Sequence, residues 1–396
     1  MLRYLLLGLV LLTFTQFSYS QSNALLTEEE LEDEFVYTDL EKALKNTSEV
    51  YILDLSSQGL DKIPKTIGRF RNVQIVILTD NQLSEFPPEL ARLKKLQTLY
   101  IDSNNIETLY LNTSDPRSFQ NLESIYVGFN PLKVIPENIK NIDLAMISLA
   151  GCKYLDLNEA FTPLASIGGL EHLDLSYLNL DTIPWEVTNL LGLKVLDLSA
   201  NPSMEWDTSF RFLAQNRSIE EIILQHNRIT MLSEELTRFK NLEALDLSYN
   251  DKLSIRQVLD VTKNIEQLHS LDLSHCKLRD LPASIGDHKK LWDLFLNNNK
   301  IGRIPGEIGK LEELETVDFS YNDILELPEE FGDLQSLEHI LLGNNPLEFL
   351  PRDMENLKDL KYIEVPKNTL DKEVKKSLRK MLPDAEIVFI KEDEDN

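Results

Sequence analysis

The sequence has 396 residues, of which 66 are Asp or Glu and 40 are Lys or Arg, so its formal net charge at pH 7 is −26. Because binding to phosphate groups relies on clustered Lys and Arg, this charge argues against nucleic acid as a partner. Beyond the first twenty residues, no stretch approaches the roughly 18 consecutive apolar residues of a membrane-spanning helix, so no transmembrane segment is predicted. Two interpretations of the acidity stay open: attraction of a basic partner, or solubility of an exported protein.

The first twenty residues predict a secretory signal peptide. A single basic residue, Arg3, precedes an apolar run over residues 4–12, and the small residue Ser20 ends the segment. We therefore expect cleavage near Ser20 and a protein that is secreted, periplasmic or held at the cell surface. A lipid anchor would need a cysteine at the cleavage site, which this sequence lacks.

Residues 21–49 are predicted to form an acidic leader and an N-terminal cap. The acidic run TEEELEDE over residues 27–34 is expected to be frayed. Thr38, followed by DLEKALKN, predicts a capped helix. A cap is needed here because the first unit of a repeat array otherwise exposes its apolar core.

Residues 50–370 contain an internal repeat of the form L-x-x-L-x-L-x-x-N-x-L. Successive copies begin 22, 23 or 26 residues apart, which overrides the prior of several domains that the chain length alone would suggest. The fourteen copies begin at Val50, Val73, Leu96, Leu122, Leu144, Leu170, Leu193, Ile219, Leu242, Leu268, Leu291, Leu314, Leu337 and Leu360.

The clearest copies are LWDLFLNNNKIGRIP, LETVDFSYNDILELP and LEHILLGNNPLEFLP. On these motifs the chain resembles the leucine-rich-repeat family across residues 50–370. The 23-residue copies with I/L-P-x-x-I-G-x-L resemble the subclass of Ras-associated and many bacterial exported repeat proteins. The resemblance implies an α/β fold, a right-handed solenoid or horseshoe with a concave parallel β-sheet and convex helices or extended segments. We do not carry over Ras binding, because the signal peptide predicts another compartment.

Each L-x-L core predicts a short strand whose leucines point inward. The asparagine after the strand is expected to satisfy backbone groups of the turns, in a ladder that includes Asn81, Asn104, Asn299, Asn322, Asn345 and Asn368. Cys152 and Cys276 replace it five repeats apart, about 24 Å at about 4.8 Å per strand, beyond disulfide reach. We interpret both as buried thiols. Leu178 also departs from the pattern, and we assign it no function.

The spacing between successive repeats predicts the structure of the segment that connects one strand to the next. The longer steps have helical spacing and caps, as in the segments from Asp207 and Ser254, and predict helices. The shorter steps carry Pro before Ile and predict extended or single-turn segments. Residues 371–396 are predicted to form a C-terminal cap with a helix over residues 371–381, a strand from Ala385 and a frayed acidic tail. The absence of paired-cysteine caps favours a bacterial exported protein.

Side chains that flank the strand leucines are expected to form the concave face. One column places aspartates beside apolar and aromatic residues, and a second is mainly aromatic. Rigid rings beside fixed polar groups suit a binding surface. The predicted partner-binding residues are Tyr100, Tyr126, Phe129, Asp174, Tyr177, Asp197, His226, Asp246, Tyr249, Asp272, His275, Phe295, Asp318 and Tyr321.

We find no sequence signature of catalysis, of a cofactor or of a metal. Adjacent strands would bring Asp174 close to Asp197, and Asp246 close to Asp272, at the roughly 5 Å separation of a retaining glycosidase. However, L-D-L-S is a frequent form of this repeat, so a structural role of the Asp–Ser pair is favoured. No G-x-S-x-G, H-E-x-x-H, P-loop or G-x-G-x-x-G is present.

Other features of the sequence carry little weight. His226 and His275 share a column but lie two repeats apart, roughly 10 Å, which is too far for one zinc ion. Three N-x-S sequons, at Asn46, Asn112 and Asn216, matter only if the host glycosylates them.

These observations predict a secreted, non-enzymatic module that binds a protein or peptide on its concave face. A basic partner would suit the charge. The alternative is a structural or adhesive cell-surface protein that binds glycans, for which exposed aromatic rings are equally suitable.

Overall fold

The computed structural model describes residues 25–111, 118–367 and 369–391. The predicted signal peptide, Asn112, Asn368 and most of the acidic tail lie outside the described residues. The described residues form two compact units: those within 25–147 and 167–169 belong to one, and those within 148–166 and 170–391 to the other. They are called unit 1 and unit 2 below.

The strands are β1 (Val36–Tyr37), β2 (Ile52–Asp54), β3 (Ile75–Ile77), β4 (Thr98–Tyr100), β5 (Ser124–Tyr126), β6 (Met146–Ser148), β7 (His172–Asp174), β8 (Val195–Asp197), β9 (Glu221–Ile223), β10 (Ala244–Asp246), β11 (Ser270–Asp272), β12 (Asp293–Phe295), β13 (Thr316–Asp318), β14 (His339–Leu341), β15 (Tyr362–Pro366) and β16 (Glu386–Ile390). The α-helices are α2 (Glu28–Glu32), α3 (Leu40–Ala43), α4 (Leu157–Ala165), α5 (Trp206–Leu213), α6 (Ile255–Thr262) and α7 (Lys372–Met381). The 3₁₀ helices are η1 (Lys65–Arg69), η2 (Pro88–Arg92), η3 (Glu137–Asn141), η4 (Trp185–Asn189), η5 (Glu234–Arg238), η6 (Ala283–Asp287), η7 (Gly306–Lys310), η8 (Glu329–Asp333) and η9 (Arg352–Asn356).

In unit 1, strands β1 to β5 pair in parallel and in the order of the chain. The middle residue of each repeat strand points into the core. Leu53 is fully buried in β2, as are its register partner Val76 in β3 and Leu99, the partner of Val76, in β4. A strand this short cannot bury its apolar face alone, so the central residues of neighbouring strands stack on each other and form a continuous core.

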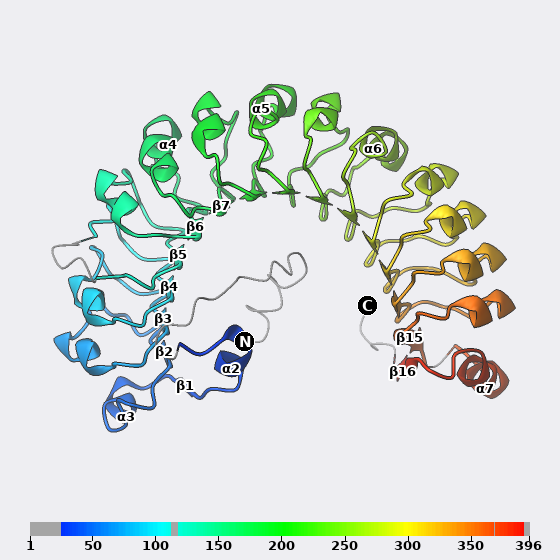
Figure 1. The fold of residues 1–396 in the computed structure, drawn as a ribbon, viewed down its shortest axis with the longest axis horizontal. Helices are drawn as coiled ribbons and strands as arrows, with labels where there is room; N and C mark the ends of the chain where they lie inside the picture. Colours follow the sequence, from blue (N-terminus) through cyan, green and yellow to red (C-terminus); the bar gives the residue numbers. More distant parts are fainter. Residues whose placement is uncertain (1–24, 112–117, 368, 392–396) are drawn as a thin grey trace. The chain divides into compact units, whose positions relative to one another are not determined.

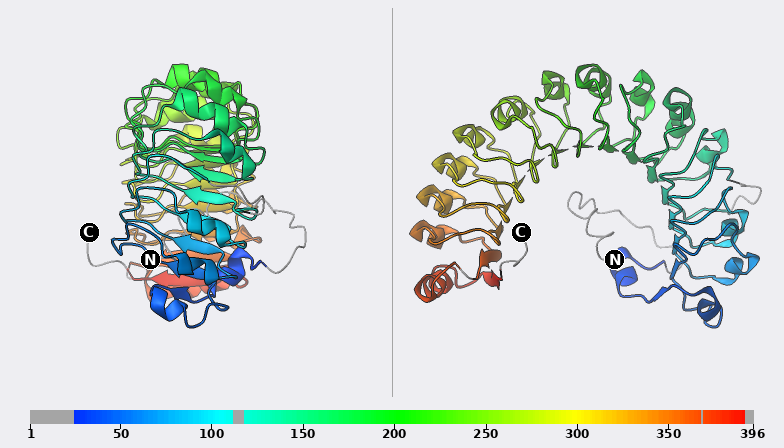
Figure 2. Two further views of the ribbon diagram at one scale, coloured as in Figure 1. Left: turned by 90° about the vertical axis from the view of Figure 1, so that its left-hand side faces the viewer. Right: turned by 180° about the vertical axis from the view of Figure 1, so that it is seen from behind.

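Unit 2 repeats the same arrangement from β7 to β16, again with parallel pairing between strands that are consecutive in sequence. Within this unit, coloured green to red, the strands line the inner edge of an arc and the helices form its outer edge (Figures 1 and 2). Each repeat therefore presents the strand residues on either side of its central apolar residue to the inner face. The fold class is the predicted α/β solenoid with a parallel sheet.

The predicted asparagine ladder is confirmed where it is described. Asn250 has no exposed surface, and its Nδ2 donates to the carbonyl oxygens of Leu224 (3.0 Å) and Leu247 (2.8 Å). Its Oδ1 accepts from the amides of Asn227 (3.1 Å) and Ile229 (2.9 Å). One side chain thus satisfies four buried backbone groups in neighbouring turns.

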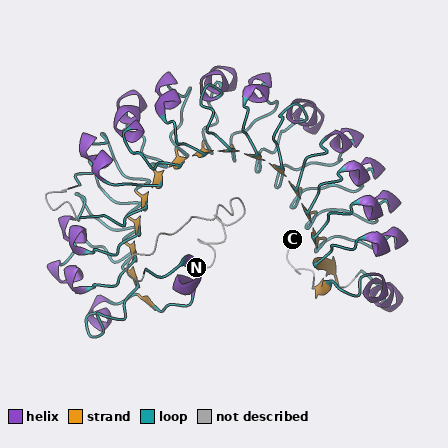
Figure 3. Cartoon of the chain, viewed as in Figure 1, coloured by secondary structure: helices purple, strands orange, loops and turns teal. Residues whose placement is uncertain are grey.

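The return segments alternate as the step lengths predict. The short steps contain five-residue 3₁₀ helices, most of them preceded by proline, as Pro282 precedes η6 and Pro305 precedes η7. Helices α5 and α6 lie in the long-step segments predicted to be helical, and Figure 3 shows how helices and loops succeed each other. The glycine of I-G-x-L lets these turns approach each other, since a Cβ on Gly286 would lie 2.6 Å from the Glu307 carbonyl oxygen.

Two N-terminal predictions need correction. The cap of α3 is Asp39 and not Thr38, because the Asp39 carboxylate accepts from the amides of Glu41 and Lys42. The acidic leader contains a helix, α2, held by a reciprocal capping box in which the Thr27 hydroxyl accepts from the Glu30 amide and Glu30 accepts from the Thr27 amide. Local hydrogen bonding therefore orders part of a segment whose charge had suggested fraying.

At the other end, α7 and β16 occupy the segments predicted to form a helix and a strand. The Asp371 carboxylate caps α7, and β16 pairs in parallel with β15. Among residues 25–111, 118–367 and 369–391, no helix is long and apolar enough to cross a membrane.

Candidate functional site

The inner face of unit 2 concentrates carboxylates and rings over strands β7 to β11. We call this surface the acid–aromatic face, defined by Asp174, Asp197, Glu221, Asp246, Asp272, His226, Tyr249 and His275. In register, Asp174 faces Asp197, and Asp246 faces Asp272. The predicted adjacency of these two pairs is therefore present, with Ile223 between the two pairs.

Asp246 and Asp272 each accept a hydrogen bond from their own repeat, and Asp246 accepts a second one from the preceding repeat. One oxygen of Asp246 accepts from the Ser248 amide at 2.8 Å, and the equivalent bond from the Ser274 amide to Asp272 is 2.7 Å. The second oxygen of Asp246 accepts from Nε2 of Gln225 at 2.6 Å. The Asp–Ser pair of L-D-L-S thus has a structural role: it hydrogen-bonds within one repeat and positions the carboxylate by an Asx-type turn.

Three rings form a continuous stack next to these carboxylates. The Tyr249 ring lies 4.3 Å from the His226 ring and 4.2 Å from the His275 ring, with interplanar angles of 24° and 8°. All three residues have φ between 53° and 59°, the left-handed region that the turn after each strand adopts throughout the repeats. Backbone bonds from Tyr249 to Ser274 and from His275 to Asn297, both 3.1 Å, hold this turn in place.

Burial on the sheet changes the ionisation of the carboxyl groups. Burial, and then the neighbouring Asp174, raise the pKa of Asp197 to about 7. Burial and then Asp246 raise the pKa of Asp272 to the same value. For a base the effect is opposite, so burial lowers the pKa of His275. The face therefore carries carboxyl groups that exchange protons near neutral pH.

Sequence reasoning missed Glu221, a further carboxyl group of the face whose pKa is raised. It lies on β9 and is 5% exposed, and burial raises its pKa to about 8, with further contributions from Asp246 and Asp197. The available signal was a glutamate at the first strand position of a repeat flanked by small residues in the adjacent strands. We overlooked it because two glutamates stand together there and only burial distinguishes Glu221 from Glu220.

The other predicted site residues lie apart from this stack. In unit 1, the rings of Tyr100 and Tyr126 stack at 4.4 Å, and Phe129 is exposed. In unit 2, Tyr177 is exposed two repeats before His226.

Further along unit 2 come Phe295, Asp318 and Tyr321. Phe295 is 9% exposed and separates Asp272 from Asp318, whose pKa is raised by burial. Tyr321 is half-buried on the turn after β13, two repeats beyond His275.

The described residues hold no group of three His, Cys, Asp or Glu side chains that could hold a metal ion. Cys152 and Cys276 are buried and do not form a disulfide, as expected.

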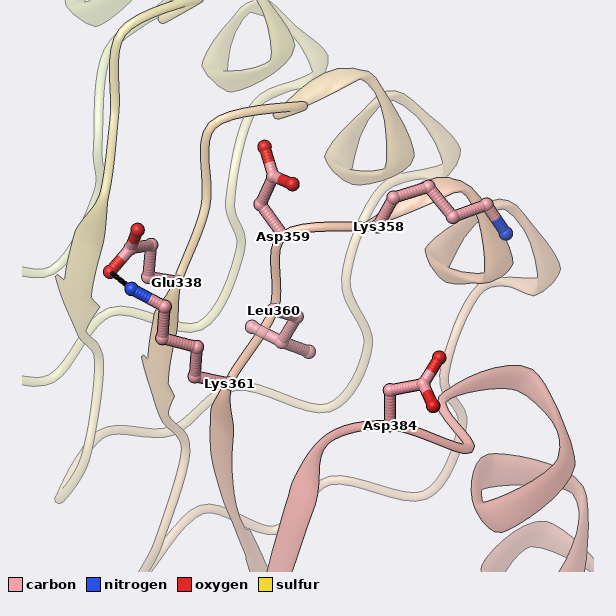
Figure 4. A pocket seen from close by; sticks show the side chains of 6 residues that line it. All are labelled: Glu338, Lys358, Asp359, Leu360, Lys361 and Asp384. Carbon is pink, nitrogen blue, oxygen red and sulfur yellow. Dashed lines mark hydrogen bonds and ion pairs between the residues drawn. The ribbon is translucent and has the colours of Figure 1, made fainter.

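A shallow hollow of about 410 Å³ lies near the end of unit 2 (Figure 4). Its polar lining is partly self-satisfied, because the Lys361 ammonium pairs with the Glu338 carboxylate. It is lined by Glu338, Lys358, Asp359, Leu360, Lys361 and Asp384.

Comparison with known proteins agrees with the repeat architecture. A family model described as a leucine-rich repeat region matches residues 215–382. A solved leucine-rich-repeat protein from Leptospira interrogans is 30% identical with a TM-score of 0.53, over 90% of this chain and 100% of that chain. Tsukushi from Rattus norvegicus is 36% identical over 88 residues, 22% of this chain, so the match spans about a quarter (24%) of that curated relative.

The structure titled TLR13-ssRNA13 complex shares the fold, with a TM-score of 0.57 over 89% of this chain and 61% of that chain at 15% identity. That protein was therefore solved with RNA, so the fold as such does not exclude nucleic acid. The repeat register, the asparagine ladder, the family match and the Leptospira relative agree: this chain belongs to the leucine-rich-repeat family.

Proposed function

We propose that this protein is a secreted, non-enzymatic binding module that captures a protein or peptide on the acid–aromatic face of unit 2. The observation that carries the proposal is the ring stack of His226, Tyr249 and His275. Stacking fixes the orientation of these rings, yet part of the stack stays exposed to solvent. Tyr249 is 41% exposed while both faces of its ring are occupied. A partner would therefore gain aromatic contact area at little cost in side-chain entropy.

The carboxylates beside the stack support a polar component of recognition. Asp246 is already oriented by Ser248 and Gln225, and Asp272 by Ser274, so neither needs to reorganise when a donor arrives. Preorganised acceptors strengthen binding because the ordering cost is met during folding. A basic partner matches both these carboxylates and the net charge of −26.

Export and the choice of partner class are further parts of the proposal. The signal peptide expected over residues 1–20 supports secretion, a periplasmic location or cell-surface display. The excess of Asp and Glu supports the exclusion of nucleic acid, which stays a prediction. The absence of catalysis also stays a prediction, supported by the structural bonds that the aspartates of the face already make.

The test is capture of partners from host surface and extracellular fractions by the purified chain. A variant combining Tyr249→Ala with Asp246→Asn and Asp272→Asn should lose capture while it keeps its circular dichroism spectrum and melting cooperativity. The matched control combines Trp185→Ala with Glu329→Gln and Asp353→Gln, all exposed on 3₁₀ helices. Equal capture by the wild type and the acid–aromatic variant would refute the proposal.

The exposed rings favour one second candidate, a structural or adhesive protein that binds glycans. Tyr177 and Tyr249 are 47% and 41% exposed, and exposed aromatic rings can make apolar contacts with sugars. A glycan array in which Tyr249→Ala abolishes a wild-type signal would support this alternative. An array without signal would count against it.

A further inference from the structure

Glu221 lies at the centre of the acid–aromatic face. Its register partners are Val195 on β8 and Ala244 on β10, whose short apolar side chains leave the carboxyl group no donor. Two residues further along the same two strands, on the same face, lie Asp197 and Asp246. Three carboxyl groups therefore converge across β8, β9 and β10, and both aspartates act electrostatically on Glu221.

Glu221 differs from its neighbours because it lacks a partner. Although it is 95% buried, its carboxyl group makes no hydrogen bond or ion pair among the described residues. By contrast, Asp246 accepts from the Ser248 amide and from Gln225, and Asp197 accepts from the Ser199 amide at 2.7 Å. Neither carboxyl oxygen of Glu221 is among the described side-chain atoms that are sealed from solvent without a partner, so water reaches the group, and a ligand that brings its own donors can replace that water.

We propose that Glu221, with Asp197 and Asp246, receives the guanidinium group of an arginine on the partner. This inference rests on the proposed function and specifies the group that anchors the partner. A guanidinium offers five donors in a planar fork, so it can bridge Glu221 and one aspartate at once. It also keeps its charge when water is removed, so it can enter this largely buried site as a cation.

The other charged groups around Glu221 do not occupy the position proposed for the arginine. On the flank of the same strands lie Glu220, Lys194 and Glu243. The Lys194 ammonium lies 3.1 Å from the Glu171 carboxylate in an ion pair, so this lysine already has a partner. His226 and Asp272 lie further along the face, and both belong to the surface that the arginine would approach.

Binding of a cation should release protons. Because burial and the two aspartates raise the pKa of Glu221 to about 8, the group is largely protonated at pH 7 in the free protein. An adjacent guanidinium favours the ionised form and lowers that pKa. The affinity for arginine should consequently increase as the pH rises from 6 to 9.

The probe is the acetylated tetra-arginine amide, titrated calorimetrically into the full chain at pH 7 in phosphate and in Tris, whose different ionisation enthalpies report proton release. Tetra-lysine is the comparison peptide. Glu221→Gln removes the carboxylate while preserving size, and Glu220→Gln removes the same charge one residue away. The melting temperature of each variant checks its fold.

We expect Glu221→Gln to weaken tetra-arginine binding about tenfold and to reduce proton release, with Glu220→Gln within about twofold of the wild type. Tetra-lysine should bind the wild type several-fold more weakly than tetra-arginine. Equal weakening by the two variants would show unspecific attraction and overturn the inference. A wild type that ignores tetra-arginine yet captures its partner through Tyr249 would overturn the inference and leave the proposed function standing.

Discussion

The Cys276 thiol donates a hydrogen bond to the Leu247 carbonyl oxygen, 3.3 Å away. In the preceding repeat, Asn250 donates from its amide to the equivalent carbonyl oxygen of Leu224 at 3.0 Å. The thiol therefore takes over one of the bonds of the asparagine ladder. The Cys276 amide still donates to Asn299 Oδ1 at 3.0 Å, so the ladder continues through this rung.

Both cysteines should be unreactive in the folded protein. Burial raises the pKa of the Cys276 thiol to about 12, which suppresses the nucleophilic thiolate, and Cys152 is equally buried. Titration with a thiol reagent such as Ellman's should detect none of the thiols in buffer and both in concentrated guanidinium chloride. Rapid labelling under native conditions would show that one of these rungs opens readily.

Removing a full rung of the ladder should cost more than removing a half-buried amide side chain outside it. Asn250→Ala leaves the carbonyl oxygens of Leu224 and Leu247 and two backbone amides without their partner, at about 1–3 kcal/mol for each group left unsatisfied. Water will enter part of the space, so we expect a loss of about 3 kcal/mol in urea unfolding. Asn297→Ala, on the half-buried face, should cost less than about 1 kcal/mol.

His288 should make the folded state sensitive to acid. It is 5% exposed, its Nε2 lies 2.8 Å from Thr262 Oγ1, and burial lowers its pKa below the ordinary value of 6.5. The unfolded chain then binds the proton more readily, so this group removes stability as the pH falls below 6.5. Between pH 8 and 5, His288→Gln should lose less unfolding free energy than the wild type; parallel losses would contradict this role.

Glu221 should act in the opposite direction. Its pKa is raised to about 8 in the folded protein, so the folded state binds the proton more tightly and loses stability as the pH rises from about 5 through 8. The stability of Glu221→Gln relative to the wild type should therefore increase by roughly 3 kcal/mol over this range. Urea unfolding at pH 5 and pH 9 measures the change, and an unchanged difference would mean that Glu221 is well solvated.

The repeat register was predictable because the same residues recur with the same period. Leu245 or Leu271 could be assigned to the core from their place in L-x-L alone, and the aspartates beside them to the inner face. The cap of α3 was harder, since Thr38 and Asp39 are both good N-caps and only geometry selects Asp39. Helix α2 depends on a reciprocal bond between Thr27 and Glu30 that charge content hides.

The sequence predicted which residues share the inner face, but not how their side chains contact one another. His226, Tyr249 and His275 could be placed in one column, but whether rings on adjacent turns stack depends on side-chain rotamers. Glu221 required knowledge of its burial, which depends on the neighbours Val195 and Ala244 from separate repeats. Tyr100 and Tyr126, predicted together with them, belong to unit 1 and form a separate pair.

The central claim, that the acid–aromatic face of unit 2 contacts the partner, is tested most directly by photocrosslinking. Benzoylphenylalanine would replace Tyr249 in one protein and Trp185, which is 57% exposed on η4, in the other. After irradiation with host surface and extracellular fractions, position 249 should yield a discrete crosslinked partner and position 185 should not. A partner crosslinked from position 185 alone, or equally from both, would contradict the account.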